Sequence, residues 1–158
     1  MDQEYENILV QVDGSKQAEA ALAKAVISAK RNGAHIDVLN VVDTRAMAYN
    51  FAGMSDGSIA YQLVDKATDY LKDLLKKVKQ DDDFDNIDIH IRLGNPKTVI
   101  AFDFPKDHKN DLLVMGASGM SRLQRAMVGS VTSFVKRNAP CDVLVVRTGV
   151  YNKQLDIK

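Results

Sequence analysis

The hydrophobic pattern of the chain consists of five short apolar runs separated by longer segments in which apolar residues recur at helical spacing. The runs are rich in β-branched residues, and they span Ile8 to Val12, Ile36 to Val42, Ile87 to Leu93, Leu112 to Met115 and Val143 to Val146. Short β-branched runs of this kind are typical of strands. The pattern therefore predicts five strands.

The segments between these runs predict helices on the basis of apolar stripes and end signals. The expected helices lie between a Ser15 cap and Gly33, along Leu63 to Val78, from Asn95-Pro96 onward, and after Gly129-Ser130. Strands that alternate with helices form parallel sheets with right-handed crossovers. We expect an α/β, doubly wound, Rossmann-like domain with a five-stranded parallel sheet and helices on both of its faces.

The order of the strands follows from how polar each one is. The third run alternates strictly and places Asp88, His90 and Arg92 on one face, as in a half-exposed edge strand, so His90 is interpreted as a solvated surface residue. His35 and His108 are interpreted in the same way. The first and fourth runs are apolar on both faces and belong in the middle. The predicted order is 3-2-1-4-5, with a switch point and a crevice between strands one and four.

The last run, Val143 to Val146, lacks the charges that protect a sheet edge from pairing. One interpretation is a homodimer in which this strand pairs antiparallel with its own copy. The other is that the tail, Gly149 to Lys158, folds back over the strand. The expected organisation is one domain over residues 1–150, followed by a tail over residues 151–158.

Composition narrows the class of partner. Lys plus Arg equals Asp plus Glu at 21 each, so no net field attracts nucleic acid or a membrane surface. No apolar run approaches the roughly 18 residues of a membrane span, and the acidic, polar start does not resemble a signal peptide. The single cysteine, Cys141, fits a reducing compartment and is interpreted as a small buried hydrophobe. We expect a cytoplasmic protein.

Small residues gather where the fourth run ends. Gly116 and Gly119 are followed after nine residues by Gly129-Ser130, which begins a predicted helix. Glycines leave backbone amides uncovered, and a helix start carries partial positive charge, so the pattern suits a phosphate group. It lacks the lysine of a P-loop and the spacing of a dinucleotide fingerprint. Its place at the switch point indicates a nucleotide site.

Two further positions lie across the predicted crevice. Asp13, at the end of the first strand, can accept a ribose hydroxyl or hold a magnesium-bound water. Alternatively, Asp13 and Ser15 only shape a turn and cap a helix. Val41, near the end of the second strand, can pack on an adenine ring or be plain core. Their position opposite the glycine motif favours the nucleotide interpretation.

The chain resembles the universal stress protein family, in its nucleotide-binding branch, over nearly its whole length. The resemblance rests on Asn7-Ile8-Leu9-Val10 with Asp13, Gly94-Asn95-Pro96, Asp111 to Gly116, the glycine motif, and Ala139-Pro140-Cys141 before the last strand. It implies ATP binding and a homodimer. Magnesium is expected with the ATP only through the Asp13 interpretation above. The nucleotide site that the resemblance implies consists of Val12, Asp13, Val41, Met115, Gly116, Ala117, Ser118, Gly119, Gly129, Ser130, Val131 and Thr132.

The chain departs from the family between the first two glycines, where Ala117-Ser118 stands in place of the bulkier polar or basic residue that family members often carry. Either phosphate affinity is lower, or Arg122 and Arg125 supply the missing charge, although both suit a solvated face. Without a loop lysine, Asp13 is the one obvious base, and turnover should be slow.

Three functions are therefore open. The favoured one is a regulator in which ATP stabilises a dimer or orders the loop from Arg45 to Ser58, and a partner protein reads the bound state. The second is a slow ATPase, or an enzyme that phosphorylates itself on Ser118 or Ser130. The third, a dimer-forming module with an empty crevice, conflicts with the intact glycine motif.

Overall fold

The protein is built on a five-stranded parallel sheet. The computed structural model describes residues 4–45, 57–118 and 128–155. The strands are β1 (Asn7–Gln11), β2 (His35–Asp43), β3 (Ile87–Gly94), β4 (Leu112–Gly116) and β5 (Asp142–Val146). Their order is β3-β2-β1-β4-β5, and every neighbouring pair is parallel. This confirms the predicted fold class and strand order.

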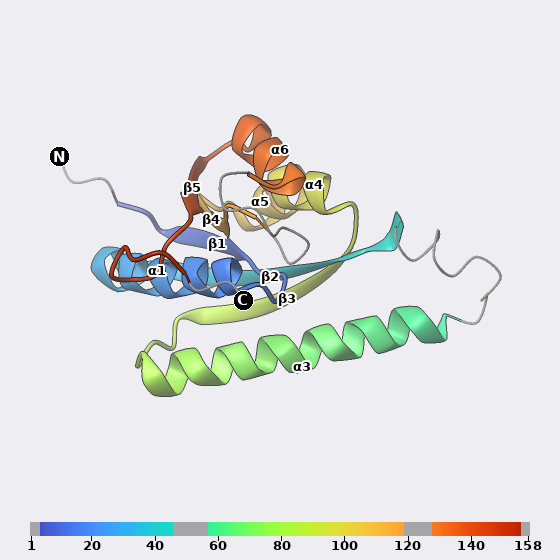
Figure 1. Cartoon of the computed structure of the whole chain (residues 1–158), viewed down its shortest axis with the longest axis horizontal. Coiled ribbons are helices and arrows are strands. Elements are labelled where there is room, and N and C mark those ends of the chain that lie inside the picture. The colour runs from blue at the N-terminus through green and yellow to red at the C-terminus, as the bar shows by residue number, and fades with distance from the viewer. Residues whose placement is uncertain (1–3, 46–56, 119–127, 156–158) are drawn as a thin grey trace.

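Helices cover both faces of the sheet, as Figure 1 shows. One face carries α1 (Lys16–Asn32) and the long α3 (Ser58–Asp81). The other carries α4 (Pro96–Thr98), the π-helical turn η1 (Val99–Asp103), α5 (Phe104–His108) and α6 (Ser130–Asn138). The connections from β1 and β4 lead to opposite faces, which is the doubly wound arrangement.

The ends of the first helix follow from single residues. The Ser15 hydroxyl accepts a hydrogen bond from the Ala18 amide, and Gly33 ends α1 in the left-handed conformation with a φ of 67°. Asn95 likewise caps α4 by accepting from the Lys97 amide. These caps confirm the helix ends predicted from the sequence.

Each central strand contributes alternate side chains to two separate cores. Val10 of β1 and Val114 of β4 lie in the core under α1 and α3. Leu9 and Leu113 lie in the opposite core, around the fully buried Phe104. Strands that are apolar on both faces must lie between two helical layers, which places β1 and β4 in the middle of the sheet.

The polar face of the edge strand β3 does not face open solvent. The side chain of His90 is 20% exposed, lies 2.8 Å from the Asp37 carboxylate through Nε2, and meets the Phe104 ring edge-on with 5.0 Å between ring centroids. His35 and His108 are 26% and 28% exposed, and both face Asp37. These three histidines are half-buried, and the interpretation of them as solvated surface residues is wrong: α5 packs on His90 through Phe104 and His108, and His35 lies among Asp37, Asp88 and Asn86. Cys141, expected to be buried, is only partly buried and packs against the core around Phe104.

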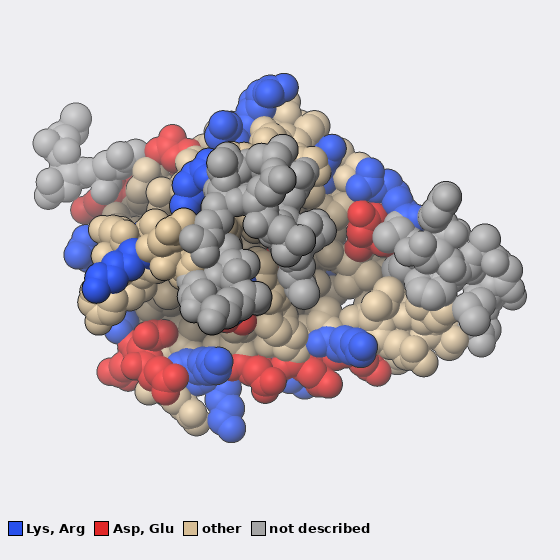
Figure 2. Space-filling model, viewed as in Figure 1, with Lys and Arg blue, Asp and Glu red and all other residues tan. Residues whose placement is uncertain are grey.

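The charged side chains are mixed in sign. Figure 2 shows acidic and basic groups interspersed along the side of the molecule that α3 forms, with no large surface of one sign among the described residues in this view. None of the helices in the described ranges is long and apolar enough to cross a membrane.

Candidate functional site

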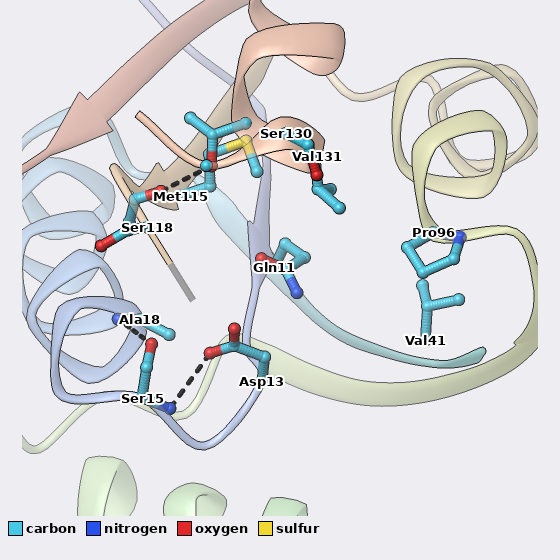
Figure 3. Close-up of a pocket in the computed structure, with 13 residues that line it drawn as sticks. Gln11, Asp13, Ser15, Ala18, Val41, Pro96, Met115, Ser118, Ser130 and Val131 are labelled. Carbon is cyan, nitrogen blue, oxygen red and sulfur yellow. Dashed lines mark hydrogen bonds between the residues drawn. The ribbon is translucent and has the colours of Figure 1, made fainter. Parts of the chain in front are cut away.

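A cavity of about 370 Å³ opens at the carboxyl ends of β1 and β4. This volume lies within the usual range of small-molecule sites. Figure 3 shows it enclosed by the end of β1, the starts of α1 and α6, and the pair Val41 and Pro96 on the opposite side. Its lining residues are Gln11, Asp13, Ser15, Ala18, Val41, Pro96, Met115, Gly116, Ser118, Gly129, Ser130, Val131 and Thr132.

The end of β1 presents two polar side chains to this cavity, those of Gln11 and Asp13 (Figure 3). Residues two apart on an extended chain point to the same side, which explains why both reach it. The Asp13 carboxylate accepts a hydrogen bond of 3.0 Å from the Ser15 amide, across the positive-φ turn at Gly14. The turn therefore holds one oxygen of Asp13, and the side chain remains half-buried at the rim of the cavity.

The end of β4 lies very close to α1. A Cβ atom at Gly116 would stand 2.8 Å from the Cβ of Gln17 and 3.0 Å from the Gln17 carbonyl carbon, so only glycine fits without movement. The same Gln17 side chain is buried and accepts from both the amide (2.7 Å) and the hydroxyl (3.0 Å) of Ser118. Gly116 thus serves helix packing as well as the cavity wall, and the Ser118 amide already has a protein partner.

The start of α6 faces the cavity without a side-chain cap. The amide of its N-cap residue, Gly129, donates to the Ala117 carbonyl at 2.8 Å. The Thr132 hydroxyl donates to the Gly116 carbonyl at 2.8 Å, which ties the first turn of the helix to the end of β4. Amides in the first turn of a helix have no intrahelical acceptor. The start of α6 is therefore a fixed set of donors with the positive end of a helix dipole behind them.

The opposite side of the cavity is apolar. Val41, from β2, and Pro96, the first residue of α4, lie next to each other in Figure 3, while Met115 of β4 closes the cavity near Val131. Among the lining residues that the structure describes, Asp13 is the one charged side chain. The cavity therefore has a polar, donor-rich side and an apolar side, joined by Gln11 and Asp13.

A tyrosine lies beneath the rim. Burial raises the pKa of Tyr70 to about 12, and the carboxylates of Glu19 and Asp13 add to the shift because a second negative charge nearby is unfavourable. Tyr70 packs against the core under α1 and α3 and stays neutral over the physiological range.

The residues expected at the site from the sequence fall into three groups. Those that line the cavity are Asp13, Val41, Met115, Gly116, Ser118, Gly129, Ser130, Val131 and Thr132. Val12 and Ala117 do not line it: the Val12 side chain belongs to the core, and Ala117 is 1% exposed. Gly119, Arg122 and Arg125 lie outside the described residues.

Four lining residues are not predicted at the cavity from the sequence, namely Gln11, Ala18, Pro96 and Ser15, and Ser15 is expected there only to shape a turn and cap a helix. A signal for Gln11 was present, because it is the single polar residue in the first apolar run and stands two positions before Asp13. Pro96 also follows a strand end, so the topology places it at the same edge of the sheet as Asp13.

A doubly wound parallel sheet with a cavity at its switch point, set between two helix starts, defines a Rossmann-like α/β protein whose cavity lies at the carboxyl ends of the strands. Within that class of fold, comparison with known protein families identifies one family. The model of the universal stress protein family matches residues 4–147, and the chain belongs to this family.

Individual relatives agree with this membership. A candidate universal stress protein of Staphylococcus epidermidis is 40% identical over 147 residues, which cover 91% of this chain and 85% of the relative. Among solved structures, universal stress protein UspA from Lactobacillus plantarum is 36% identical, with a TM-score of 0.79, covering 92% of this chain and all of that chain.

Two other solved members hold adenine nucleotides. One is a universal stress protein in complex with cAMP, at 23% identity and a TM-score of 0.58. The other is the universal stress protein from Archaeoglobus fulgidus in complex with dAMP, at 21% identity and a TM-score of 0.62. Because both sequence identities are below 25%, these two structures show only that the fold is shared with this chain.

Proposed function

We propose that this protein binds ATP, together with magnesium, in the cavity between β1 and β4, and acts as a homodimeric, nucleotide-dependent regulator in the cytoplasm. The observation that carries the proposal is the division of the cavity into an uncapped helix start on one side and an apolar pair on the other. A nucleotide has the same division, with charged phosphates at one end and a flat base at the other.

The phosphates fit the side formed by α6. The uncapped first-turn amides of Ser130, Val131 and Thr132 offer donors to an anion, and the helix dipole adds positive potential. The Ser130 side chain is exposed at this helix start and lines the cavity, so its hydroxyl can donate to a phosphate oxygen as well.

The base fits the opposite side. Val41 and Pro96 offer apolar surfaces on which a purine ring can stack, and the Gln11 amide points into the space between them and Asp13 (Figure 3). The second oxygen of Asp13 is then placed for a ribose hydroxyl. The cAMP and dAMP complexes of two members with the same fold support an adenine nucleotide as the ligand class.

Magnesium fits the donor set of the cavity. Mg²⁺ is bound through one or two carboxylates together with substrate phosphates, and Asp13 is the carboxylate that this cavity offers among its described lining residues. Asp13 would hold the ion through water, and the ion would offset phosphate charge where the described lining contains no lysine or arginine.

Binding without rapid turnover is favoured over an enzymatic role. Phosphoryl transfer requires concentrated positive charge on the transferred group, and the described lining residues provide none from side chains. Ser118 is 7% exposed and donates its hydroxyl to Gln17, which disfavours it as a phosphate acceptor. The alternative, a slow ATPase or self-phosphorylation on Ser130, uses the same site.

Dimerisation is supported by the outer edge of β5. The Val146 carbonyl accepts a hydrogen bond from the Ala117 amide, so the backbone groups of Val146 point toward β4. Because the backbone groups of successive residues in a strand point to opposite sides, those of Val143 and Val145 point away from β4. Leu144 is 43% exposed. The described part of the tail forms a turn that Lys24 of α1 holds through Thr148 and Asn152, and so it lies on α1 (Figure 1). The described part of the tail thus leaves the edge of β5 for a second copy.

The regulatory element proposed from the sequence is the loop from Arg45 to Ser58. Residues 46–56 of that loop lie outside the described residues. At its start, Arg45 pairs with Asp43, with 3.1 Å between the guanidinium and the carboxylate. Because Asp43 ends β2, near Val41, a bound nucleotide can favour one arrangement of this segment, and a partner protein would read that state.

The test of nucleotide binding compares two glycine variants. Gly129→Val places a branched side chain on the cavity wall, and we expect ATP affinity to fall at least about tenfold in titration calorimetry with Mg²⁺ present. Gly149→Ala, far from the cavity, should bind ATP like the parent. Equal affinities of Gly129→Val and the parent protein, or the absence of any adenine nucleotide binding by the parent, would contradict the proposal.

Turnover and dimerisation need separate measurements. Phosphate release over hours that disappears in Asp13→Ala, while ATP binding persists, would favour the enzymatic alternative. Val145→Pro removes an outward amide without touching the β4 ladder, because proline is tolerated on edge strands, and should yield a monomer in sedimentation velocity. A parent protein that sediments as a monomer at micromolar concentration would exclude the dimer.

A further inference from the structure

A buried carboxylate lies at the centre of a histidine cluster on the face of the sheet under α5. Asp37 of β2 has a side chain that is only 5% exposed, and His90 of β3 contacts its Oδ1 through Nε2 at 2.8 Å. On the other side, His108 at the end of α5 has its Nδ1 3.9 Å from Asp37 Oδ2. Three segments far apart in the sequence thus converge on one carboxylate.

A buried ionised carboxylate is costly unless it is paired with charge or bound to a metal. Besides the histidines, Asp37 has Asn110 as a partner, whose amide nitrogen donates to Oδ2 at 3.0 Å. Asn110 is 7% exposed, and its own Oδ1 is buried without a hydrogen-bond partner among the described residues. The cluster therefore contains an incompletely satisfied oxygen beside the carboxylate, as in a site that lacks one of its members.

The three side chains have the spacing of metal ligands. One oxygen of Asp37 and one ring nitrogen each of His90 and His108 lie within 4.8 Å of one another. Bonds of about 2.0 to 2.2 Å at a tetrahedral zinc ion place its ligand atoms about 3.4 Å apart. The present contacts reach different oxygens of Asp37, with 2.8 Å from His90 Nε2 to Oδ1 and 3.9 Å from His108 Nδ1 to Oδ2, so the side chains must rotate to place one oxygen and both nitrogens around an ion.

We propose that Asp37, His90 and His108 form a binding site for Zn²⁺ or a similar divalent transition-metal ion. Two imidazoles and a carboxylate are ligands that zinc prefers, whereas magnesium prefers oxygen ligands alone. The partial exposure of His90 and His108 gives an ion a path to the buried carboxylate. Three protein ligands leave a fourth position for solvent or another ligand.

A second combination of side chains shares the carboxylate but suits an ion less well. His35 Nε2 lies 3.3 Å from both Asp37 and Asp88, and its Nδ1 is 2.8 Å from the Asn86 side-chain oxygen. Both nitrogens of His35 thus already have protein partners. Asp88 is 70% exposed, so an ion there would sit in solvent. These facts make His35 a supporting group that orients Asp37.

The surroundings hold the proposed ligands in place. The rings of Phe104 and His108 are stacked, with 4.0 Å between centroids and 7° between planes, and His90 packs edge-on against both. Arg92 Nη2 lies 3.5 Å from His108 Nε2; because a guanidinium only donates, a metal on Nδ1, which leaves the proton on Nε2, requires Arg92 to turn aside. An ion bound here would connect β2, β3 and α5. The site is separate from the cavity between β1 and β4, because none of its residues lines that cavity.

The test is a Zn²⁺ titration of the full chain, purified with chelator and then freed of it. We expect one ion per chain, with Co²⁺ giving the visible spectrum of a tetrahedral site. His90→Gln and His108→Gln should each weaken zinc binding at least about tenfold, since even residues behind the ligands contribute that much in known sites. His108 is near the surface, so its variant should fold, as circular dichroism would check.

Two control variants distinguish this site from the combination around His35 and from the cavity between β1 and β4. Asp88→Asn should retain zinc binding within about threefold, because Asp88 belongs only to the second combination and is 70% exposed. Gly129→Val should bind zinc like the parent while losing ATP. No stoichiometric zinc binding by the parent would overturn the proposal, as would affinity that is unchanged in both His90→Gln and His108→Gln. Loss of binding in Asp88→Asn, with binding retained in His90→Gln and His108→Gln, would move the site to the other combination and would also overturn this assignment.

Discussion

Gly116→Ala tests whether the glycine that begins the phosphate-type motif is needed for packing. The substitution adds one methyl group at the end of β4, where it would meet Gln17 Cβ at 2.8 Å and two backbone atoms of α1 at 3.0 and 3.1 Å. Backbone atoms cannot rotate away as a flexible side chain can. The helix must therefore shift relative to the sheet.

The expected cost is that of overpacking a close contact, about 1 to 3 kcal/mol. For a chain of 158 residues, each kcal/mol lowers the melting temperature by about 2 to 4 °C, so the total decrease is about 2 to 12 °C. Urea unfolding should show a lower midpoint with an unchanged slope, because the surface exposed on unfolding stays the same.

Gly149→Ala is the matched control for this experiment. Its new Cβ would meet only Leu155 at 3.6 Å and the Lys153 carbonyl at 3.9 Å, which are ordinary contacts. Its stability should stay within about 0.5 kcal/mol of the parent. If Gly116→Ala proves as stable as Gly149→Ala, the close approach of β4 and α1 is not a constraint and the reasoning is refuted.

Three further predictions concern hydrogen bonds and protonation. Gln17→Ala should cost about 1 to 3 kcal/mol in urea unfolding, because it leaves two buried donors of Ser118 unpaired, whereas Gln17→Glu, which can accept both bonds, should cost less. Thr132→Val keeps the shape but loses the bond to the Gly116 carbonyl, so we expect a loss of about 1 kcal/mol; a neutral result would show that the bond adds nothing. Folding raises the pKa of Tyr70 from 10.0 to about 12, so its contribution to stability is present below pH 10 and is lost as the pH rises to about 12. A Tyr70→Phe variant should therefore lose less stability than the parent between pH 10 and pH 12, as urea unfolding would measure.

Much of the fold is predictable because it depends on local pattern. The two-sided apolar runs of β1 and β4 and the polar alternation of β3 indicate the strand order, and Ser15 and Gly33 mark the ends of α1. The pattern misleads at His90. Alternation shows that His90 shares a face with other polar residues, but it cannot show that α5 packs over that face.

The candidate site is predictable to a similar degree. The glycine motif and Asp13 identify the edge of the sheet at which the cavity lies, because the topology brings the carboxyl ends of β1 and β4 together. The pattern cannot reveal that Val12 points into the core, that Pro96 lies against Val41, or that Gly116 is required by the approach of α1.

The sequence by itself determines the class of fold, the helix ends, the place of the cavity and membership of the universal stress protein family. These properties rest on periodicity and on single residues that act on their own neighbours in the chain. The tertiary structure alone decides that Gln17 bonds Ser118 and that three histidines surround Asp37. Such contacts join segments that are distant in sequence, and their geometry arises only when helices pack on the sheet.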